Sequence, residues 1–600
     1  MSPLLIYDAQ SVLASWVAQR LSAAAAGRLE LAAAQDHDGP AVDRELRLRI
    51  PEGTEWRDLD ALLHAAALIE GGGAALERDQ RSAFWRRVHR LGYRWATENR
   101  VPALAVAKRL WNADPTTYLR SRWLFLRLLG LSFLFAFVSL GVQVRGLFGA
   151  QGIVPLQLML EGAGGGRVYL AVPSLLWFSA SDPVLVGCCG VGALASLLLM
   201  AGVAQRAALA VMGLLYLSLV ALGAPFLSFQ WDTLLLEAGF LSLFLAPAGL
   251  WNPRPAAATG WAARLLLKWL LFRVMFLSGL VKLTSGDASW RQFTAMDFHL
   301  WTQPLPSVGA WWMAHHAAVT LRAQTALTLV IELVFPFLLF GHHPLRRIGV
   351  MGMLALLGGI AATGSYGFLG LLTASLCLLV IDDQDLRWLD RWVPVGTLGA
   401  RSRSRLRWVG GGLILGWVFT ATVAASWARA TRSWEPVPTP LRVAHALTSP
   451  LMIANGYGMF EVMTRDRLEL SVEGSEDGQT WRPYRFRYKP GAPEQAPRYA
   501  APHMPRLDWM MWFAALGRCE DSPWLFSLQK ALLEGSPPVE GLFESVPFEG
   551  RPPRRTRIQA ARYRFAPRGS QAFWTVEPLG AFCPEVALQD GRLVRAELRE

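Results

Sequence analysis

Nine long apolar runs constrain what this 600-residue chain can fold into. They lie at about 123–144, 183–204, 207–224, 226–247, 263–284, 320–341, 348–363, 366–381 and 408–427. Most approach the ~20 residues that a helix needs to cross a bilayer, and a helix satisfies its own backbone hydrogen bonds there. Only 18% of the residues are charged, against ~25% in ordinary globular chains. We therefore expect an α-helical polytopic membrane protein with about nine spans, give or take one or two.

The arginines predict the orientation. The net charge of +13 comes almost entirely from arginine, and the basic residues lie mostly beside the apolar runs, which argues against a nucleic-acid partner. Links rich in arginine tend to alternate with links poor in it, and the richest is 382–407. By the positive-inside rule we expect a cytoplasmic N-terminus and an extracytoplasmic C-terminus, without a cleavable signal peptide. The bias of arginine over lysine suggests a bacterial inner membrane, or the endoplasmic reticulum membrane if the source is eukaryotic.

Residues 1–122 have the pattern of a small α/β domain. Strands are expected at 4–8, 29–34 and 46–50, and helices at 12–24, 56–69 and 80–98. The stretches YDAQSVLASWV and HRLGYRWATENR resemble the DCC family of thiol-disulfide oxidoreductase-like domains. Ser11 and Ala14 occupy the two positions where that family has cysteines, so no dithiol exchange is expected. The resemblance implies a degenerate thioredoxin-like domain kept for structure or binding; the alternative is an unrelated cytoplasmic cap.

Five charged residues fall inside the apolar runs, where charge is costly and is usually paired or functional. They are Asp232, Glu237, Arg273, Lys282 and Glu332. At ~1.5 Å per residue, Glu237, Arg273 and Glu332 share a depth of about 16 Å. We expect Arg273 to pair with Glu237, Glu332 or both, and Asp232 to pair with Lys282. We interpret the cluster as a structural ion-pair network; a proton relay or polar substrate site is the alternative.

Residues 430–600 are expected to form a β-rich domain with a helical insert, such as a small sandwich. Strands are expected at 467–472 and 481–488 around an Asp477-Gly478 hairpin, and again at 556–565 and 572–576. Helices are expected at 507–516 and 524–533. A disulfide between Cys519 and Cys583 is possible if the compartment is oxidising.

Catalytic and metal-binding patterns are weak. The chain has no G-x-S-x-G, P-loop or H-E-x-x-H motif. His299, His315 and His316 lack a further ligand in register, so we expect neither a metal nor a cofactor. An enzyme would have Lys282 and His299 as available bases. A transporter would use the charges inside the membrane, although no inverted repeat is visible.

Three stretches resemble the lipase maturation factor family. They are LSFQWDTLLLEAGFLSLFLAP (227–247), LFRVMFLSGLVKLTSGDASWRQFTAMDFHLWTQPLP (271–306) and NGYGMFEVMTRDRLELSVEGSEDGQTWRPYRFRYKPG (455–491), which continues as APHMPRLDWMMWFAALG. The resemblance covers roughly 123–580. It implies a membrane region at 123–429, an extracytoplasmic region at 430–600, and a factor that helps exported lipases to fold. The family is also distantly similar to the membrane region of vitamin K-dependent carboxylase, which keeps an enzyme as an alternative.

The resemblance also gives the outer aromatic residues a candidate role. Tryptophans gather at 290–312 and 509–524, outside the apolar runs. With an exported lipase-like protein as client, the candidate contact residues are Trp290, Trp301, Trp509, Trp512 and Trp524. An interfacial aromatic belt or a domain core explains the same residues without a client. The sequence leaves the oligomeric state open.

Overall fold

The computed structural model describes residues 3–7, 17–19, 21–22, 25, 29–33, 46–51, 54–68, 76, 82–98, 118–162, 168–254, 261–392, 405–548 and 550–596. The chain divides into two compact units, Met1–Thr116 and Thr117–Glu600. The second unit therefore contains both the apolar helices and the C-terminal strands, which the sequence had suggested as separate domains divided near residue 430.

The N-terminal unit contains a four-stranded mixed sheet. Its strands are β1 (Leu4–Tyr7), β2 (Glu30–Ala33), β3 (Arg47–Arg49) and β4 (Glu55–Arg57), in the order β2-β1-β3-β4. β1 and β2 are parallel, whereas β3 is antiparallel to both β1 and β4. Helices α3 (Asp58–Ala67) and α5 (Ala83–Glu98) accompany the sheet, which makes this unit α/β. Most of the expected helix at 12–24, together with Ser11 and Ala14, lies outside the described residues.

Six helices of the described residues are long and apolar enough to cross a membrane. They are α7 (Leu119–Gly141), α11 (Asp182–Ala201), α12 (Gln205–Leu222), α18 with α19 (Ala318–Leu333 and Phe335–Leu338), α20 (His343–Thr363) and α22 (Arg405–Thr431). Local signals set their ends: α11 has a proline in its first turn, and Gly202 caps its C-terminus in the left-handed region at φ 84°. The chain is therefore a helical polytopic membrane protein.

The six candidate spans are fewer than the nine expected. The other three apolar runs also form helices, namely α13 (Gln230–Leu245), α14 (Trp261–Thr284) and α21 (Leu369–Val380). α13 has 16 residues and α21 has 12, which is short of the ~20 needed for a full crossing. α14 is long enough, but it carries four basic residues, Arg264, Lys268, Arg273 and Lys282.

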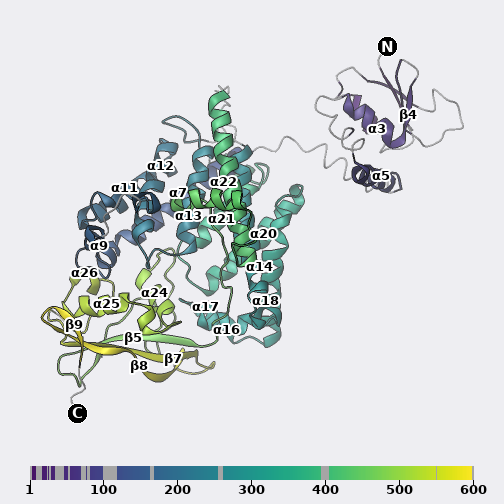
Figure 1. The fold of residues 1–600 in the computed structure, drawn as a ribbon. Helices are drawn as coiled ribbons and strands as arrows, with labels where there is room; N and C mark the ends of the chain where they lie inside the picture. Colours follow the sequence, from purple (N-terminus) through teal and green to yellow (C-terminus); the bar gives the residue numbers. More distant parts are fainter. Residues whose placement is uncertain are drawn as a thin grey trace. The chain divides into compact units, whose positions relative to one another are not determined.

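Short helices connect these elements. They are α8 (Val144–Phe148), α9 (Leu156–Gly162), α10 (Val168–Ala171), η1 (Leu175–Trp177), α15 (Ala288–Arg291), α16 (Ala295–Thr302), α17 (Val308–Ala314), η2 (Arg387–Arg391), α23 (Thr439–Thr448) and η3 (Ser449–Leu451). α15, α16 and α17 follow α14, and α16 and α17 lie near the C-terminal strands (Figure 1). Residues 303–307 separate α16 from α17.

The C-terminal region forms one five-stranded antiparallel sheet. Its strands are β5 (Arg467–Ser475), β6 (Arg482–Pro483), β7 (Arg555–Phe565), β8 (Trp574–Gln589) and β9 (Arg592–Arg595), in the order β6-β5-β7-β8-β9. Between β6 and β7 the chain forms α24 (Arg506–Ala514), η4 (Cys519–Asp521), α25 (Trp524–Leu533) and α26 (Pro537–Glu540). The expected β-rich fold with a helical insert is present, but as a single sheet covered by helices instead of a sandwich.

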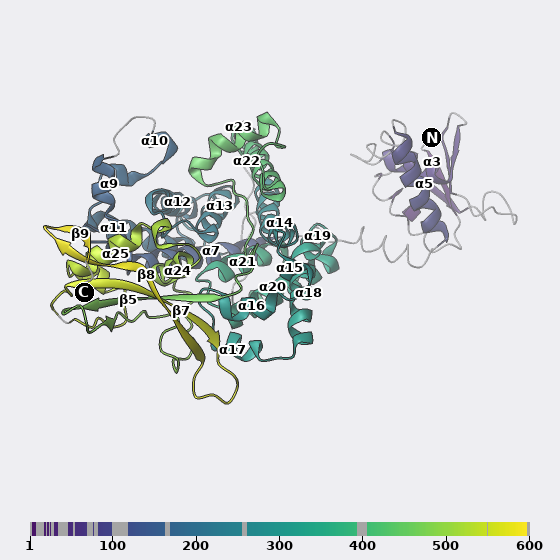
Figure 2. The ribbon, with the colours of Figure 1, turned by 60° about the horizontal axis from the view of Figure 1, so that its bottom comes forward.

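Helices α24 and α25 lie between this sheet and the apolar helices, and two views show the same layering (Figures 1 and 2). α24 packs on β5, and α25 packs on β7 and β8. On their other side, the ring of Trp509 lies 5.0 Å from that of Trp231, and the ring of Trp524 lies 5.3 Å from that of Phe226. One hydrophobic core therefore runs from the membrane helices into the C-terminal region.

Candidate functional site at the junction of the membrane helices and the C-terminal region

Residues 453–463, which we call the junction segment, follow η3 and lead toward β5. In this segment Gly458 exchanges two hydrogen bonds with the Gln230 side chain at the start of α13, each of 3.0 Å. The Met459 N–H donates to Ser278 Oγ on α14 at 3.4 Å. The segment is therefore fixed to two helices by its own backbone.

The first buried ion pair lies beside this segment. Arg273 on α14 donates to Glu237 on α13, and both side chains are buried. Arg273 also donates to the carbonyl oxygen of Asn455 at 2.8 Å. The second carboxylate oxygen of Glu237 accepts from the Tyr457 hydroxyl at 2.8 Å and from Asn455 Nδ2 at 3.1 Å. The structure thus brings Arg273 and Glu237 together, and the junction segment supplies the remaining donors.

A second ion pair joins the membrane helices to α24. Arg506 donates to both oxygens of Asp232, at 2.6 and 2.7 Å, and its exposed fraction is 1% against 0% for Asp232. Tyr216 on α12 donates to Asp232 Oδ1 at 2.6 Å. Burial disfavours the charged guanidinium, but Asp232 and Tyr216 outweigh it and hold the pKa of Arg506 above its ordinary value. Arg506 therefore stays protonated, as a bidentate pair requires.

Lys282 and Glu332 form a third pair, between α14 and α18. The Lys282 ammonium lies 2.9 and 2.8 Å from the two carboxylate oxygens and also donates to the Met459 carbonyl at 3.1 Å. The expected pair of Asp232 with Lys282 is therefore wrong, and Glu332 does not pair with Arg273. The depth estimate placed the charges along their helices, but it contained no information about Arg506, which neutralises Asp232 from 274 residues away.

A further charged group fixes β5 to the end of α16 and to the segment that follows it. Arg467 donates to the carbonyls of Trp301 at 3.0 Å and Pro304 at 2.8 Å. Glu469 accepts from Arg467 Nε at 2.7 Å and lies 2.7 Å from Lys489 Nζ. Neither this group nor Arg506 was predicted, because charged residues outside apolar runs give no hydropathy signal of burial. The sequence offered one signal of their importance. They lie inside the stretches 455–491 and 501–517, which carry the family resemblance described above.

Three of the five candidate client-contact tryptophans are buried. The exposed fractions are 1% for Trp290, 2% for Trp509 and 7% for Trp524, so the expectation that they form an outer contact surface is wrong for these residues. They pack into the interface between the helices and the C-terminal region, where large aromatic side chains bury the most area. Trp301 and Trp512 are half-buried, and their indole N–H groups donate to the carbonyls of Asp297 and Thr302.

The histidines lie apart from any metal-like arrangement. Among the residues that the structure describes, no group of three His, Cys, Asp or Glu side chains is placed to hold a metal ion. The ring nitrogens of His315 lie 2.7 Å from the Trp311 carbonyl and 3.0 Å from the Ala566 carbonyl. Burial, with a smaller effect from Lys282, lowers the pKa of His299 to about 4. His299 is therefore neutral near pH 7.

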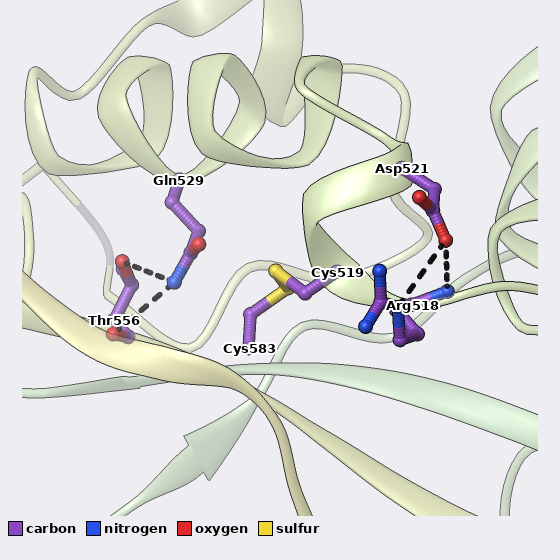
Figure 3. Close-up of a disulfide and its surroundings, with 6 residues drawn as sticks. All are labelled: Arg518, Cys519, Asp521, Gln529, Thr556 and Cys583. Atoms are coloured by element: carbon purple, nitrogen blue, oxygen red, sulfur yellow. Dashed lines mark hydrogen bonds and ion pairs between the residues drawn. A yellow bond between two sulfur atoms is a disulfide. The ribbon is translucent and has the colours of Figure 1, made fainter.

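A disulfide joins Cys519 in η4 to Cys583 in β8 (Figure 3). It links the helical layer to the sheet over 64 residues of sequence. The side chain of Gln529 lies near it and donates to the Thr556 carbonyl at 3.3 Å. The bond therefore reinforces the same layer contact that α25 makes with β7 and β8.

These features define a class of protein. It is a polytopic membrane protein whose C-terminal β region is held on its helices by buried ion pairs. Comparison with known proteins identifies that class more closely. The profile described as lipase maturation factor transmembrane domain matches residues 120–388, and the one described as lipase maturation factor C-terminal domain matches 453–584. The chain belongs to the lipase maturation factor family.

Individual relatives agree with this assignment. Lipase maturation factor 2 of Gallus gallus is 32% identical, over 79% of this chain and 82% of the relative. The human lipase maturation factor 2 is 33% identical, over 79% and 83%. Lipase maturation factor 1 of Bos taurus is 33% identical, over 79% and 90%. No solved structure matches this chain.

Proposed function

We propose that this protein is a membrane-embedded maturation factor that helps an exported, lipase-like client to fold. The observation that carries the proposal is the similarity to lipase maturation factors 1 and 2, which includes both the transmembrane and the C-terminal domain. The client is a protein segment or surface, so the factor itself needs no catalytic group. Trp301 and Trp512 keep exposed area beside the sheet and are the remaining client-contact candidates.

We further propose that the N-terminus is cytoplasmic and the C-terminal region extracytoplasmic, in a bacterial inner membrane. The alternation of arginine-rich links supports this orientation. The disulfide between Cys519 and Cys583 supports it independently, because disulfides persist in oxidising compartments outside the cytoplasm. A client exported through the same membrane would then meet the C-terminal sheet.

We propose a structural role for the charges among the helices. Asp232, Glu237 and Glu332 each have a basic partner. Two of these acids, Asp232 and Glu237, are bonded to residues of the C-terminal half. We call these contacts the clamp, because they hold the C-terminal half on the helices. They favour a structural role over a path for protons or substrate. A carboxylase-like enzyme would use Lys282 as a base, and its ammonium is instead engaged by Glu332 and two carbonyls.

We propose that the N-terminal unit is a thioredoxin-like domain without a redox pair. Its parallel β1–β2 pair needs a crossover connection, and the mixed four-stranded sheet with α3 and α5 supports an α/β fold of this kind. Ser11 and Ala14 replace both cysteines, so the domain would serve binding or structure.

Deletion of the gene in its own host tests the proposed function. We expect the activity of a secreted lipase to fall relative to the amount of lipase polypeptide, with its transcript unchanged. The wild-type gene should restore activity. Arg506→Met should not, because it breaks the clamp, whereas Arg568→Met, at an exposed arginine, should. Unchanged activity of every secreted lipase and esterase after deletion would refute the maturation role.

A further inference from the structure

A basic cavity lies at the end of the membrane helices where α14 begins and α21 ends. It has a volume of about 140 Å³ and is lined by Arg264 and Lys268 of α14, by Tyr118 before α7, and by Leu379 and Val380 of α21. A cavity of about 10–15 Å³ already holds one water. This one therefore has room for a group of several heavy atoms, such as a phosphate.

The two cations of this cavity have no acidic partner. Among the residues that the structure describes, no carboxylate forms an ion pair with Arg264 or with Lys268. The Arg264 guanidinium carbon lies 3.4 Å from the centre of the Tyr118 ring, and Lys268 Nζ lies 4.9 Å from that of Phe340. Both side chains are half-buried, and neither has a nitrogen among the buried polar atoms that lack a partner. Their N–H groups are therefore accessible to a ligand.

Basic side chains around Tyr118 are, by contrast, neutralised within the chain. Arg346 lies 2.8 Å from Asp382, and Arg120 lies 2.6 Å from Asp390. Acidic residues are thus present at this end of the helices, but they are engaged by other arginines. A half-buried charge without a counter-ion is unfavourable, so an external anion would supply what the chain does not.

The chemistry of the two cations favours a phosphate. A guanidinium presents a planar fork that matches two phosphate oxygens, and an ammonium adds a compact positive charge. Arg264 and Lys268 are four residues apart, so both project from the same face of α14. A zwitterionic ligand would bring its own ammonium beside these two cations, which is repulsive. The ligand should therefore carry a net negative charge.

The apolar side chains at the cavity favour a lipid over a soluble phosphate. Trp261 and Leu265 also line it, and their exposed fractions are 64% and 43%. They lie in the first two turns of α14, and tryptophan is enriched where membrane helices meet the headgroups. Basic pockets between membrane helices are known to bind anionic headgroups. Acyl chains attached to a bound phosphate would lie outside the cavity, against Trp261 and Leu265.

We propose that this cavity binds the phosphate of an anionic glycerophospholipid from the surrounding membrane. Arg264 and Lys268 donate to the phosphate oxygens, and the acyl chains lie along the exposed apolar side chains of α14. The site goes beyond the maturation role, and its occupancy does not depend on which client the protein assists.

Removal of the two charges tests the site against a matched control. Arg264→Gln combined with Lys268→Gln removes both cations and keeps polar side chains in the cavity. Arg387→Gln combined with Arg391→Gln removes the same amount of charge from η2, which follows α21. Both of these arginines are exposed and do not line the cavity.

The experiment uses the purified full chain in a neutral detergent. The probes are photoactivatable phosphatidylglycerol and photoactivatable phosphatidylcholine with the same acyl chains. We expect the phosphatidylglycerol to label peptides from the start of α14, and unlabelled phosphatidylglycerol to compete. The phosphatidylcholine should label these peptides at least about tenfold less, because its choline cation would face Arg264 and Lys268. The variant without the two cavity cations should lose the labelling, and the η2 control should retain it.

Equal labelling by the two lipids would overturn the proposal. Labelling that survives the loss of both cavity cations, or that the η2 control loses equally, would overturn it too. If millimolar inorganic phosphate displaces the probe as completely as unlabelled lipid does, the site holds a soluble phosphate and the lipid assignment is wrong. The comparison of the two lipids and the position of the labelled peptides need only the wild-type protein. They therefore decide the point even if the cavity variant fails to fold.

Discussion

The pair of Arg506 with Asp232 offers the most direct test of how the C-terminal region is held on the membrane helices. We predict that Arg506→Met destabilises the protein by about 3–5 kcal/mol, the usual cost of leaving one partner of a buried pair uncompensated. Two charge-assisted hydrogen bonds, of 2.6 and 2.7 Å, are lost. At ~1.5–3 kcal/mol each they account for a loss of the same size.

The expected loss depends on Asp232 remaining buried. Its exposed fraction is 0%, and after the change the Tyr216 hydroxyl is the main donor left to it. Adding Asp232→Asn removes the stranded charge and keeps an acceptor for Tyr216. The double variant should therefore lose no more than the single variant, whereas independent sites would add to about 6–10 kcal/mol.

Unfolding of the purified full chain in detergent, followed by tryptophan fluorescence, measures this effect. Trp509 on α24 lies 5.0 Å from Trp231 on α13, so separation of the two layers changes the surroundings of both rings. Arg568→Met is the control; it removes an exposed side chain and should shift stability by less than ~0.5 kcal/mol. A free energy of unfolding for Arg506→Met within ~1 kcal/mol of wild type would refute the clamp, because breaking a buried pair costs more.

Two further predictions concern the C-terminal region. Replacing Cys519 and Cys583 together by serine should cost about 2–5 kcal/mol, measured by thermal unfolding with and without reductant. Asp508→Asn should remove a pH dependence: burial raises the pKa of Asp508 to about 6 despite bonds from the backbone N–H groups of Tyr488 and Lys489. The folded state then binds an extra proton between about pH 4 and 6, so this group's contribution to stability falls by about 3 kcal/mol as the pH rises through that window.

Difference measurements check both predictions. Reductant should lower the melting temperature of the wild type and leave the double serine variant unchanged; an equal shift in both would contradict a stabilising disulfide. For Asp508→Asn, the gain over wild type should grow from pH 4 to pH 6 and then level off. Subtracting the wild type cancels other titrating groups such as His503, whose pKa is lowered to about 4. A gain that is independent of pH would show that Asp508 does not titrate in this window.

Much of the helical fold could be predicted because an apolar run is a local signal. Each of the nine runs forms a helix, from α7 to α22. The number of candidate spans was harder to predict, because α13 is short and α14 carries charges that are neutralised or buried by partners distant in sequence. The length of an apolar run predicts the helix. It does not predict how charges in that run are accommodated, because this depends on partners distant in sequence.

The strands, like the helices, were predictable only where the signal is local. Alternation predicted β5 and β7, but β8 continues to Gln589, well beyond the expected end at 576. Pro578 and Gly580 interrupt its pattern, and the ladder with β7 contains bulges there. Among the described residues, β9 pairs only with the far end of β8 and no strand pairs with β8 at Pro578 on that side, where a missing N–H is tolerated. No alternation rule predicts a strand through such a position.

The candidate site was predictable only where both partners lie on apolar runs. Depth along the helices brought Glu237 and Arg273 to one level, and the structure pairs them. Asp232 was assigned the wrong partner because Arg506 lies outside the nine apolar runs and only charges on the runs were paired. The outer tryptophans were misjudged for a related reason: an aromatic side chain on an exposed surface and one at a buried interface have the same sequence signature.

The buried pairs also make the two regions matched by the family profiles dependent on each other. A chain ending before residue 453 would leave Asp232 without its cation and Glu237 without the donors of Asn455 and Tyr457. Uncompensated carboxylates among apolar helices are unfavourable, so the helices cannot reach this arrangement until the C-terminal region has been synthesised and docked. The transmembrane and C-terminal matches therefore correspond to one structural unit, whose surface is complete only when the clamp has closed.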